Sequence, residues 1–418
     1  MSTRSPSTPV WSESATIYAA IELSSTSWLL AIQAPDRKKL SRHRVPAGDC
    51  ARLIGYLEQA RARVHEQTDA PVDVITCYEA GRDGFWLHRV LQARGIHNQV
   101  VDAASLLTDR KKKSAKTDKI DVRKILRALK LWHEGDREAC RMVHVPAPDQ
   151  EDERRPVREA QRLKKEQTGH LNRIASLTAQ HGIRTFQPLR RDWREQLERL
   201  QTADGRPLPR RLKAEITREC ERLHHLRGQL LELAREDRAR RRAAQRSAQD
   251  KPAADKSALE QRAELIAHLR TLRGVGEVGA SVLVDEVFFR PFQNRQELAG
   301  YVGLTPQPNS SGPREMDQGL DKAGNALARW AMIELAWRWL QFQPDSALSR
   351  WFHARVGSAR GRLRRIKLVA MARKLLVALW PKLNSQRGPG DGRALIFLGF
   401  SSFRPGSGPN PGATRLGK

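Results

Sequence analysis

The segment from Pro146 to Lys256 constrains the fold most, because it is almost entirely charged and has the residue spacing of helices. Leu and Ile recur in it at heptad-like intervals, as in CERLHHLRGQLLELARED from Cys220 to Asp237. Apolar residues at that spacing predict a long helical hairpin or a coiled coil. Such helices serve either as a spacer or as a dimerising element, and they divide the chain into three parts.

The part before this segment, residues 16–145, alternates apolar β-rich runs with helical stretches. The β-rich runs are ATIYAAIELS, SWLLAIQ, VDVITCYEA and HNQVVDA, and the helical stretches include CARLIGYLEQARARV and GFWLHRVLQARG. This order predicts an α/β sheet domain. We expect the preceding residues 1–15 to form a flexible N-terminus.

The part after it, residues 257–384, predicts an all-α domain of compact helices around glycine-rich turns. LRTLRGVGEVGASVLVDEV reads as helix, glycine hairpin and helix, with Gly274 and Gly276 framing a tight turn. A turn of this kind can aim backbone N–H groups at a phosphate without reading bases, and it can equally be an ordinary connection between helices. The Pro/Gly/Ser-rich residues 385–418 predict a disordered tail.

Composition indicates the class of partner. The 418 residues carry a formal net charge of +28 with a pI of about 10.8, which indicates a polyanion: nucleic acid first, an anionic membrane surface second. No apolar run approaches the roughly 20 residues of a membrane-spanning helix, and the N-terminus lacks an apolar signal core. We therefore expect a soluble intracellular protein. The four cysteines are far apart, which indicates buried, reduced thiols rather than a zinc site or disulfides.

Two aspartates stand among positive charges in SAKTDKIDVRKIL. Asp118 and Asp121 are three positions apart at the start of a predicted helix, so their Cβ atoms would lie about 5–6 Å apart. The apolar positions of that helix offer a buried stripe: Ile120, Ile125, Leu126 and Leu129. In the simplest interpretation both acids stabilise the helix, because they lie near the positive end of its dipole, and pair with neighbouring bases.

Two further acids favour a different interpretation. Glu22 lies in the strand IYAAIELS and Glu79 ends the run VDVITCYEAG, where a carboxylate is costly to bury without a partner. If all four acids converge at one edge of the sheet, they repel one another unless a divalent cation binds, and hard oxygen ligands suit Mg²⁺. Such sites bind a scissile phosphate in phosphoryl transfer. Nearby bases would then contact the nucleic-acid backbone: Lys111, Lys112, Lys113, Lys116 and Lys119.

An acid on the first strand, YEA after a later strand, and then KTDxxD is an order that resembles a known domain. It is similar to the RuvC-like, ribonuclease-H-fold domain of the DEDD transposases of bacterial insertion sequences, the insertion sequence 110 family. The family's tetrad of Asp, Glu, Asp and Asp would fall on Glu22, Glu79, Asp118 and Asp121. Glu22 departs from this pattern by one methylene, which would shift the metal and weaken or abolish cleavage.

The C-terminal part also resembles this family, in the pattern GLTP, SSG and DKAGN before a long helix. In the family a serine of this loop attacks the phosphodiester and forms a covalent phosphoserine intermediate. The serine would be Ser311, directly before Gly312, or Ser310 if the alignment shifts by one residue. The segment after it is usually basic in the family but here contains acids, which leaves as phosphate contacts Arg314, Lys322 and Asn325.

The resemblance implies a DNA transposase or site-specific recombinase that uses Mg²⁺ and is guided by a structured non-coding RNA. It also implies a bacterial cytoplasmic protein near the nucleoid and a homo-oligomer, a dimer or a tetramer, in which the two domains meet. Two alternatives stay open. A catalytically impaired copy would bind nucleic acid without cutting it, and a RuvC-like nuclease would hydrolyse with water and use Ser311 only as a turn residue.

Overall fold

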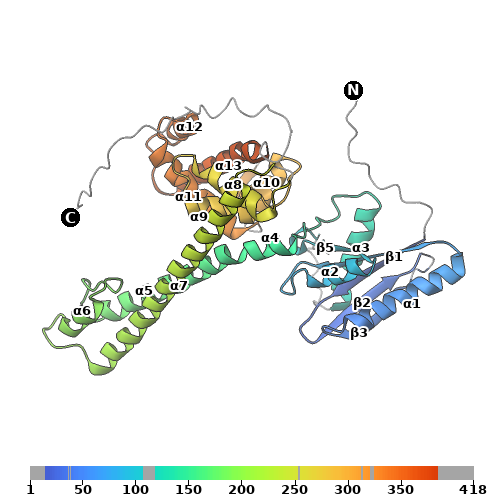
Figure 1. Ribbon diagram of the computed structural model, residues 1–418, viewed down its shortest axis with the longest axis horizontal. Coiled ribbons are helices and arrows are strands. Elements are labelled where there is room, and N and C mark those ends of the chain that lie inside the picture. Colours follow the sequence, from blue (N-terminus) through green and yellow to red (C-terminus); the bar gives the residue numbers. More distant parts are fainter. Residues whose placement is uncertain are drawn as a thin grey trace. The chain divides into compact units, whose positions relative to one another are not determined.

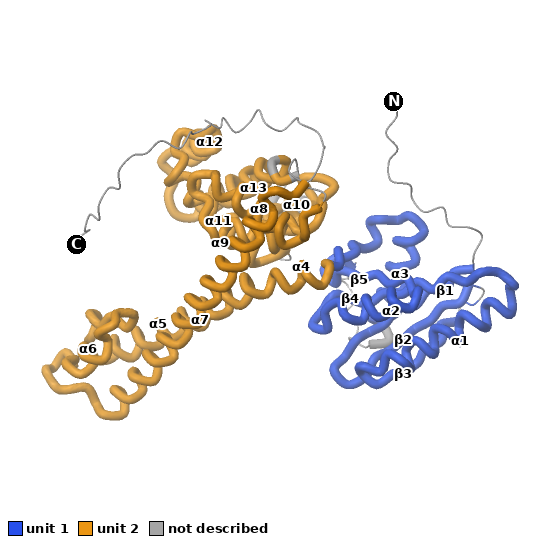
Figure 2. The backbone as a smooth tube through the Cα atoms, viewed as in Figure 1, with its two compact units in different colours: residues 1–145 blue, residues 146–418 orange. Residues whose placement is uncertain are grey.

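The computed structural model describes residues 15–35, 37, 39–106, 118–252, 255–311, 314–320 and 324–384, with backbone alone at positions 118–120, 307–311, 314–319, 382 and 384. These residues belong to two compact units, 1–145 and 146–418 (Figure 2). The predicted flexible N-terminus, apart from Ala15, and the predicted disordered tail lie outside the described residues.

The first unit is built on a mixed five-stranded sheet in the order β3-β2-β1-β4-β5. Strands β1, β2 and β3 form an antiparallel meander, whereas β4 and β5 run parallel to β1. Their bounds are β1 Ala15–Glu22, β2 Ser27–Gln33, β3 Ser41–Pro46, β4 Val72–Glu79 and β5 His97–Val101. The predicted α/β sheet domain is confirmed.

Helices cover both faces of this sheet (Figure 1). Helices α1 (Cys50–Thr68) and α2 (Trp86–Ala93) pack on one face, and α3 (Asp118–His133) packs on the other. The side chain of Asp49 caps α1 by accepting a hydrogen bond from the amide of Arg52. A short 3₁₀ turn, η1 (Ala103–Ser105), follows β5.

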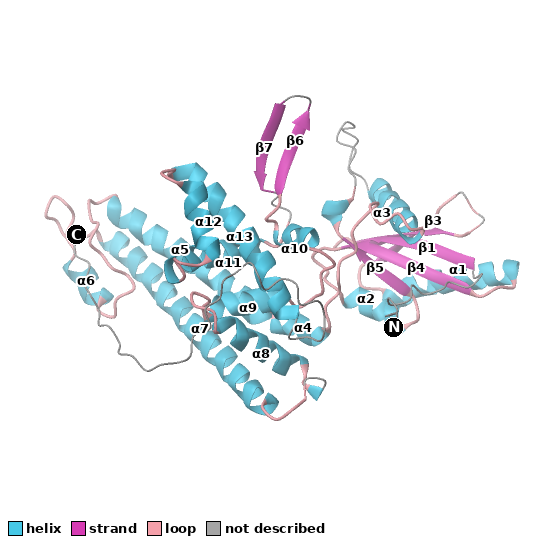
Figure 3. Ribbon diagram, turned by 90° about the horizontal axis from the view of Figure 1, so that it is seen from above, coloured by secondary structure: helices cyan, strands magenta, loops and turns pink. Residues whose placement is uncertain are grey.

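The second unit begins with the charged helices predicted from the sequence: α4 (Pro148–Glu153), α5 (Arg155–Ala179), α6 (Trp193–Arg199) and α7 (Arg210–Ala248). Helices α5 and α7 lie side by side (Figures 1 and 3). Around α6 the tip of this helical hairpin encloses a small core that includes Ile174, Leu177, Trp193, Leu197, Ile216 and Leu223. The predicted helical middle is confirmed, and its role in dimerisation stays a prediction.

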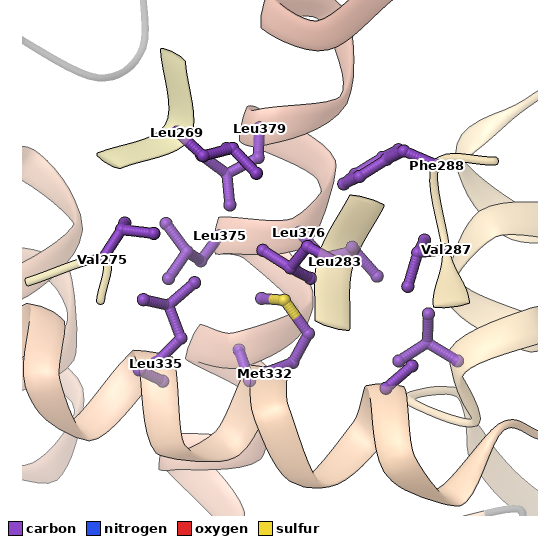
Figure 4. Packing of buried hydrophobic residues seen from close by; sticks show 14 of the residues in the cluster. Leu269, Val275, Leu283, Val287, Phe288, Met332, Leu335, Leu375, Leu376 and Leu379 are labelled. Atoms are coloured by element: carbon purple, nitrogen blue, oxygen red, sulfur yellow. The ribbon is translucent and has the colours of Figure 1, made fainter. Parts of the chain in front are cut away.

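The remaining helices gather around a larger apolar core (Figure 4). They are α8 (Ala258–Arg270), α9 (Glu277–Glu286), α10 (Arg295–Val302), α11 (Ala326–Phe342), α12 (Ala347–Val356) and α13 (Gly361–Asn384). Met332 and Leu335 of α11 face Leu283 of α9 and Leu375 and Leu376 of α13 (Figure 4). Within the part of the chain that is described, each helix is too short or too polar to cross a bilayer.

The all-α prediction for this part of the chain was wrong in one respect. Strands β6 (Pro306–Ser311) and β7 (Arg314–Leu320) form an antiparallel hairpin between α10 and α11 (Figure 3). Two prolines and a run of polar residues in PQPNSS give no strand signal, because Pro removes a ladder donor and no residue there is β-branched. The hairpin exists through its own cross-strand pairing, in which Ser311 lies opposite Arg314.

Candidate functional site

Glu22 and Glu79 end two neighbouring strands. β1 and β4 are parallel, and Ile21 is paired with Tyr78, so the next residues along both strands are Glu22 and Glu79. The carboxyl ends of parallel neighbours lie about 4.8 Å apart. Both glutamates are half-buried. The structure thus brings together two of the four predicted acids at one edge of the sheet.

Both positions face the same side of the sheet, because side chains alternate along a strand. In β1, Tyr18 and Ala20 pack on the α3 face, and Glu22 is the next residue of that parity. In β4, Ile75 and Cys77 pack on the α3 face, and Glu79 follows in the same way. The two strand-end positions therefore share the face on which α3 lies.

Helix α3 brings its N-terminus to this edge. Near its C-terminus the Nδ1 atom of His133 lies 2.8 Å from the hydroxyl oxygen of Tyr18, early in β1. Asp121 is about 18 Å from His133 along the helix. Glu22 is about 13 Å from Tyr18 along the strand, and the path from Tyr18 to Glu22 runs in the same direction as the path from His133 to Asp121. The thiol of Cys77 approaches the carbonyl oxygen of Ile125, midway between the two ends, at 3.9 Å. The start of α3 therefore lies close to the ends of β1 and β4.

Asp121 is half-buried and stands four residues before the buried Ile125. Asp118 begins the helix three residues earlier, and its side chain lies outside the described residues, as does that of Lys119. The other lysines predicted to contact nucleic acid, Lys111, Lys112, Lys113 and Lys116, are outside them as well. The structure thus places three of the four tetrad residues, Glu22, Glu79 and Asp121, with their side chains, and places Asp118 by its backbone.

The donors at this edge are all carboxylate oxygens, the hard ligands that Mg²⁺ prefers. Their chemistry suits that ion, and the positive end of the α3 dipole lowers the cost of holding negative charge there. Within the described ranges, no group of three or more His, Cys, Asp or Glu side chains is gathered closely enough to hold a metal ion. The side chain of Asp118, the fourth member of the tetrad, lies outside these ranges. The metal site stays a prediction.

The cysteines offer no competing nucleophile. Cys77, Cys140 and Cys220 are buried, Cys50 is half-buried, and none forms a disulfide within the described residues. Burial raises the pKa of all four thiols, and it raises that of Cys220 to about 12. A thiol with a raised pKa is poorly ionised and unreactive near neutral pH.

The second candidate element is the serine hairpin, which we define as residues 306–320. Ser310 and Ser311 are the last residues of β6, and Ser311 lies opposite Arg314, the first residue of β7. The backbone of Arg314 is described at the start of β7, whereas Lys322 and the side chains of both serines lie outside the described residues. The structure thus places both candidate serines at the tip of a hairpin.

The base of the serine hairpin is a close backbone junction between the two sequence motifs that flank it. The amide of Asn325 donates a hydrogen bond to the carbonyl oxygen of Tyr301 at 2.7 Å. Gly324 lies against Gly303, which ends α10 in the left-handed conformation with φ +73°. A Cβ on Gly324 would lie 2.3 Å from the amide nitrogen of Gly303 and 2.7 Å from the carbonyl oxygen of Tyr301. Only glycine permits this approach.

We therefore expect Gly324→Ala to destabilise the second unit by about 1–3 kcal/mol or more, since the added methyl meets backbone that cannot move aside. Thermal unfolding followed by circular dichroism measures this. The matched control is Gly228→Ala in α7, where a Cβ would meet no atom within 4 Å. That change is expected to be neutral or to stabilise by up to about 1 kcal/mol. Equal stability of the two variants would contradict the junction.

Asn325, at this junction, contacts the buried carboxylate of Glu286. The amide side chain of Asn325 donates a hydrogen bond to Glu286 at 2.8 Å, while its oxygen accepts two from the first amides of α11. Glu286 ends α9, and only 1% of its side chain is exposed. It also accepts hydrogen bonds from Arg154 at 2.8 Å and from Arg158 at 2.6 and 3.1 Å. One carboxylate thus joins the start of α5 to the base of the serine hairpin.

The charge state of this cluster follows from its contacts. Burial opposes the ionisation of Glu286, yet hydrogen bonds from Arg158 and Arg154 outweigh it and hold the pKa of Glu286 below its ordinary value. The hydrogen bond to Glu286 in turn raises the pKa of Arg158. Glu286 is therefore an anion at neutral pH, compensated by two guanidinium groups.

Sequence reasoning missed Glu286, Arg154 and Arg158. The signal was present in GASVLVDEV, where two acids end an apolar helical run. The same cost of burying a carboxylate that singles out Glu79 applies to Asp285 and Glu286. Asp285 accepts hydrogen bonds from the buried Arg262 at 2.6 and 2.7 Å.

Gly274 and Gly276 lie in the connection between α8 and α9. Gly274 has φ +91°, and a Cβ there would lie 3.3 Å from both the carbonyl oxygen of Arg338 and the Cβ of Phe342. Gly276 precedes the first residue of α9, close to the guanidinium of Arg338. The glycines are thus explained by close packing against α11, and phosphate binding by this turn stays a prediction.

Comparison with known proteins assigns the chain to one family. The family model described as transposase IS116/IS110/IS902 family matches residues 266–350, which include the glycine turn and the serine hairpin. The putative transposase y4rJ of Sinorhizobium fredii is 43% identical over 371 residues, 88% of this chain and 92% of that protein. The transposase for insertion sequence element IS1111A of Coxiella burnetii is 24% identical over 337 residues, 79% of this chain and 84% of that protein. The chain belongs to the IS116/IS110/IS902 family of transposases.

Proposed function

We propose that this transposase cuts and rejoins DNA strands through a covalent phosphoserine intermediate, with Mg²⁺ held by Glu22, Glu79, Asp118 and Asp121. The observation that carries the proposal is the convergence of β1, β4 and the start of α3 at one edge of the sheet. The mixed sheet with acids at the ends of adjacent parallel strands supports the assignment of a RuvC-like domain.

In this mechanism the hydroxyl oxygen of Ser311, or of Ser310, attacks the phosphorus atom of the scissile phosphodiester. A bond from the serine oxygen to phosphorus forms, the bond from phosphorus to the leaving deoxyribose oxygen breaks, and the serine proton is released to a base. Rejoining is the reverse step, in which a deoxyribose hydroxyl of the partner strand displaces the serine. No phosphodiester bond energy is lost to water.

The carboxylates have a positioning role. A serine hydroxyl is a poor nucleophile at its ordinary pKa and needs a base or a metal ion. Bound Mg²⁺ would supply Lewis acidity and stabilise charge on the phosphoryl oxygens. The tetrad and the serine hairpin belong to different units, so the proposal requires the two to meet, within one chain or across a homo-oligomer, a dimer or a tetramer.

We also propose that a structured RNA encoded with the element guides the reaction, as the family resemblance implies. The net charge of +28 supports simultaneous binding of RNA and DNA, since each phosphate contact releases counterions. Digestion of co-purified RNA should then abolish strand transfer and leave salt-sensitive binding of DNA. Transfer that persists after complete digestion would exclude the guide.

The decisive experiment is a denaturing gel for covalent protein–DNA adducts. The protein is expressed with its flanking DNA in the presence of Mg²⁺, and wild type is compared with Ser310→Ala, Ser311→Ala and Asp118→Asn. We expect an adduct that is lost on changing one serine and on changing Asp118. Cutting without an adduct would favour a nuclease that hydrolyses with water, and binding without either would favour an impaired copy.

A further inference from the structure

The segment that contains α12 and α13 carries basic residues and no acidic ones. No Asp or Glu occurs between Asp345 and Asp391. This segment places a set of bases on α12 and α13, which we call the arginine surface: Arg355, Arg362, Arg364, Arg365, Lys367 and Lys374. All but the half-buried Lys367 are exposed.

Many bases of the helical middle have acidic partners, whereas the arginine surface has no acid within its own segment. Arginines of α5 and α7 form ion pairs with acids of their own or neighbouring helices, as Arg162 does with Glu166 and Arg240 with Glu153. Within the described part of the chain, no base of the arginine surface is in an ion pair. Uncompensated positive charge that gathers on one surface needs an external anion.

The start of α13 projects from the body of the second unit. Every residue from Gly361 to Ile366 is exposed, so the first turn and a half of the helix is solvated on all sides. Two aliphatic side chains stand exposed among the arginines there, Leu363 at 58% and Ile366 at 42%. A solvated helix end that carries arginines and aliphatic side chains can fit into a groove of a binding partner.

Three bases of the arginine surface, from α12 and α13, lie near aromatic rings of α11 and α12. The guanidinium of Arg364 lies 5.2 Å from the ring of Trp337 in α11. The ammonium of Lys374 lies 4.9 Å, and the guanidinium of Arg355 6.0 Å, from the ring of Trp351 in α12. Cation–π contacts of this kind hold long side chains in place. These contacts connect α13 to α11 through Arg364 and to α12 through Lys374.

We propose that the arginine surface binds duplex DNA, with the start of α13 in the major groove. The major groove of B-form DNA is about 12 Å wide and admits an α-helix, whereas the major groove of A-form RNA is deep and narrow. The bases contact phosphates, and Leu363 and Ile366 supply apolar contacts of the type that thymine methyl groups accept. This inference deepens the proposed function by assigning a DNA contact outside both catalytic elements.

The test measures binding of a 30-base-pair DNA duplex by fluorescence anisotropy at several salt concentrations, without Mg²⁺ and on a Ser310→Ala/Ser311→Ala background. Binding is thereby separated from cleavage, so a failure of the proposed chemistry leaves the measurement intact. In Arg355→Gln/Arg362→Gln/Arg365→Gln we expect the slope of log K against log salt to become shallower by about 2.7, since each of three phosphate contacts contributes about 0.9. The loss of affinity is then about 40-fold larger at 50 mM than at 200 mM salt.

The matched control is Arg162→Gln/Arg190→Gln/Arg206→Gln, which removes the same charge from exposed arginines that already pair with Glu166, Asp192 and Asp204. Its slope should equal that of the parent protein. An equal change in both triple variants would overturn the proposal, because net charge alone would explain it. With a duplex RNA of the same length, the slope of log K against log salt should change by less than one phosphate contact contributes, about 0.9. A change equal to that seen with DNA would overturn the assignment to DNA.

Discussion

Replacing Glu79 by Gln is expected to slow DNA strand cleavage by about a hundredfold to a thousandfold and to leave DNA binding intact. Glu79 ends β4 beside the end of β1, on the face of the sheet where α3 begins. A neutral amide keeps the shape of the side chain but removes one negative ligand from the proposed metal site. Several kcal/mol of transition-state stabilisation is then lost, and each 1.36 kcal/mol is tenfold in rate.

The same loss is expected in Glu22→Ala, because the two glutamates occupy equivalent positions on adjacent strands. Glu22→Asp restores the acid usual in the family and is expected to keep or increase activity. Rates are measured as strand cleavage under single-turnover conditions, and Mg²⁺ binding is measured separately by calorimetry. Activity unchanged in Glu22→Ala would exclude this residue from the site.

Asp102 provides the matched control, since it follows β5 at the same edge of the sheet. Its carboxylate already accepts a hydrogen bond from the amide of Ala104 and lies 3.4 Å from the guanidinium of Arg141. Asp102→Asn removes the same charge from the same edge and is expected to cut DNA at the parent rate. If Asp102→Asn cuts DNA as slowly as Glu79→Gln, the loss of rate reflects the overall negative charge at this edge rather than the loss of a specific metal ligand.

The sheet and the paired strand-end acids were predictable because they depend on short-range pattern. Alternation along ATIYAAIE and VDVITCYE indicates strands, and an acid that ends such a run stands out because burying it is costly. The meeting of Glu22 with Glu79 required one further fact, that β1 and β4 are parallel neighbours. No local pattern contains that fact, because pairing partners are chosen by the whole fold.

The candidate serines were identified by resemblance to a family, and the hairpin that carries them was not predicted. Its strands have few apolar residues. They form because Gly324 and Gly303 bring the ends of the hairpin together and because Asn325 donates a hydrogen bond to Glu286. These contacts join residues that are distant in sequence. The anchor Glu286 was overlooked for the same reason, since its partners Arg154 and Arg158 precede it by more than a hundred residues.

Removal of that anchor is the second large effect that we expect. Glu286→Ala leaves the guanidinium of Arg154, whose side chain is 9% exposed, buried without its counter-charge. Breaking one partner of a buried ion pair costs about 3–5 kcal/mol, so the free energy of unfolding of the second unit should fall by that amount. Chemical denaturation measures it. In the exposed pair of Arg162 and Glu166, the control Glu166→Ala should cost no more than about 0.5 kcal/mol.

The two arginines should also differ in their effects. Arg158 is 54% exposed, so water can replace much of its contact with Glu286, and Arg158→Ala should be milder than Arg154→Ala. Equal costs would mean that burial does not set the strength of this cluster. At a temperature where Glu286→Ala is still folded, it should bind DNA normally but form less serine adduct, because Asn325 has lost its acceptor at the base of the hairpin. Normal adduct formation would show that Glu286 stabilises the fold without positioning the serines. The contact of α5 with Glu286 would then have no influence on the reaction.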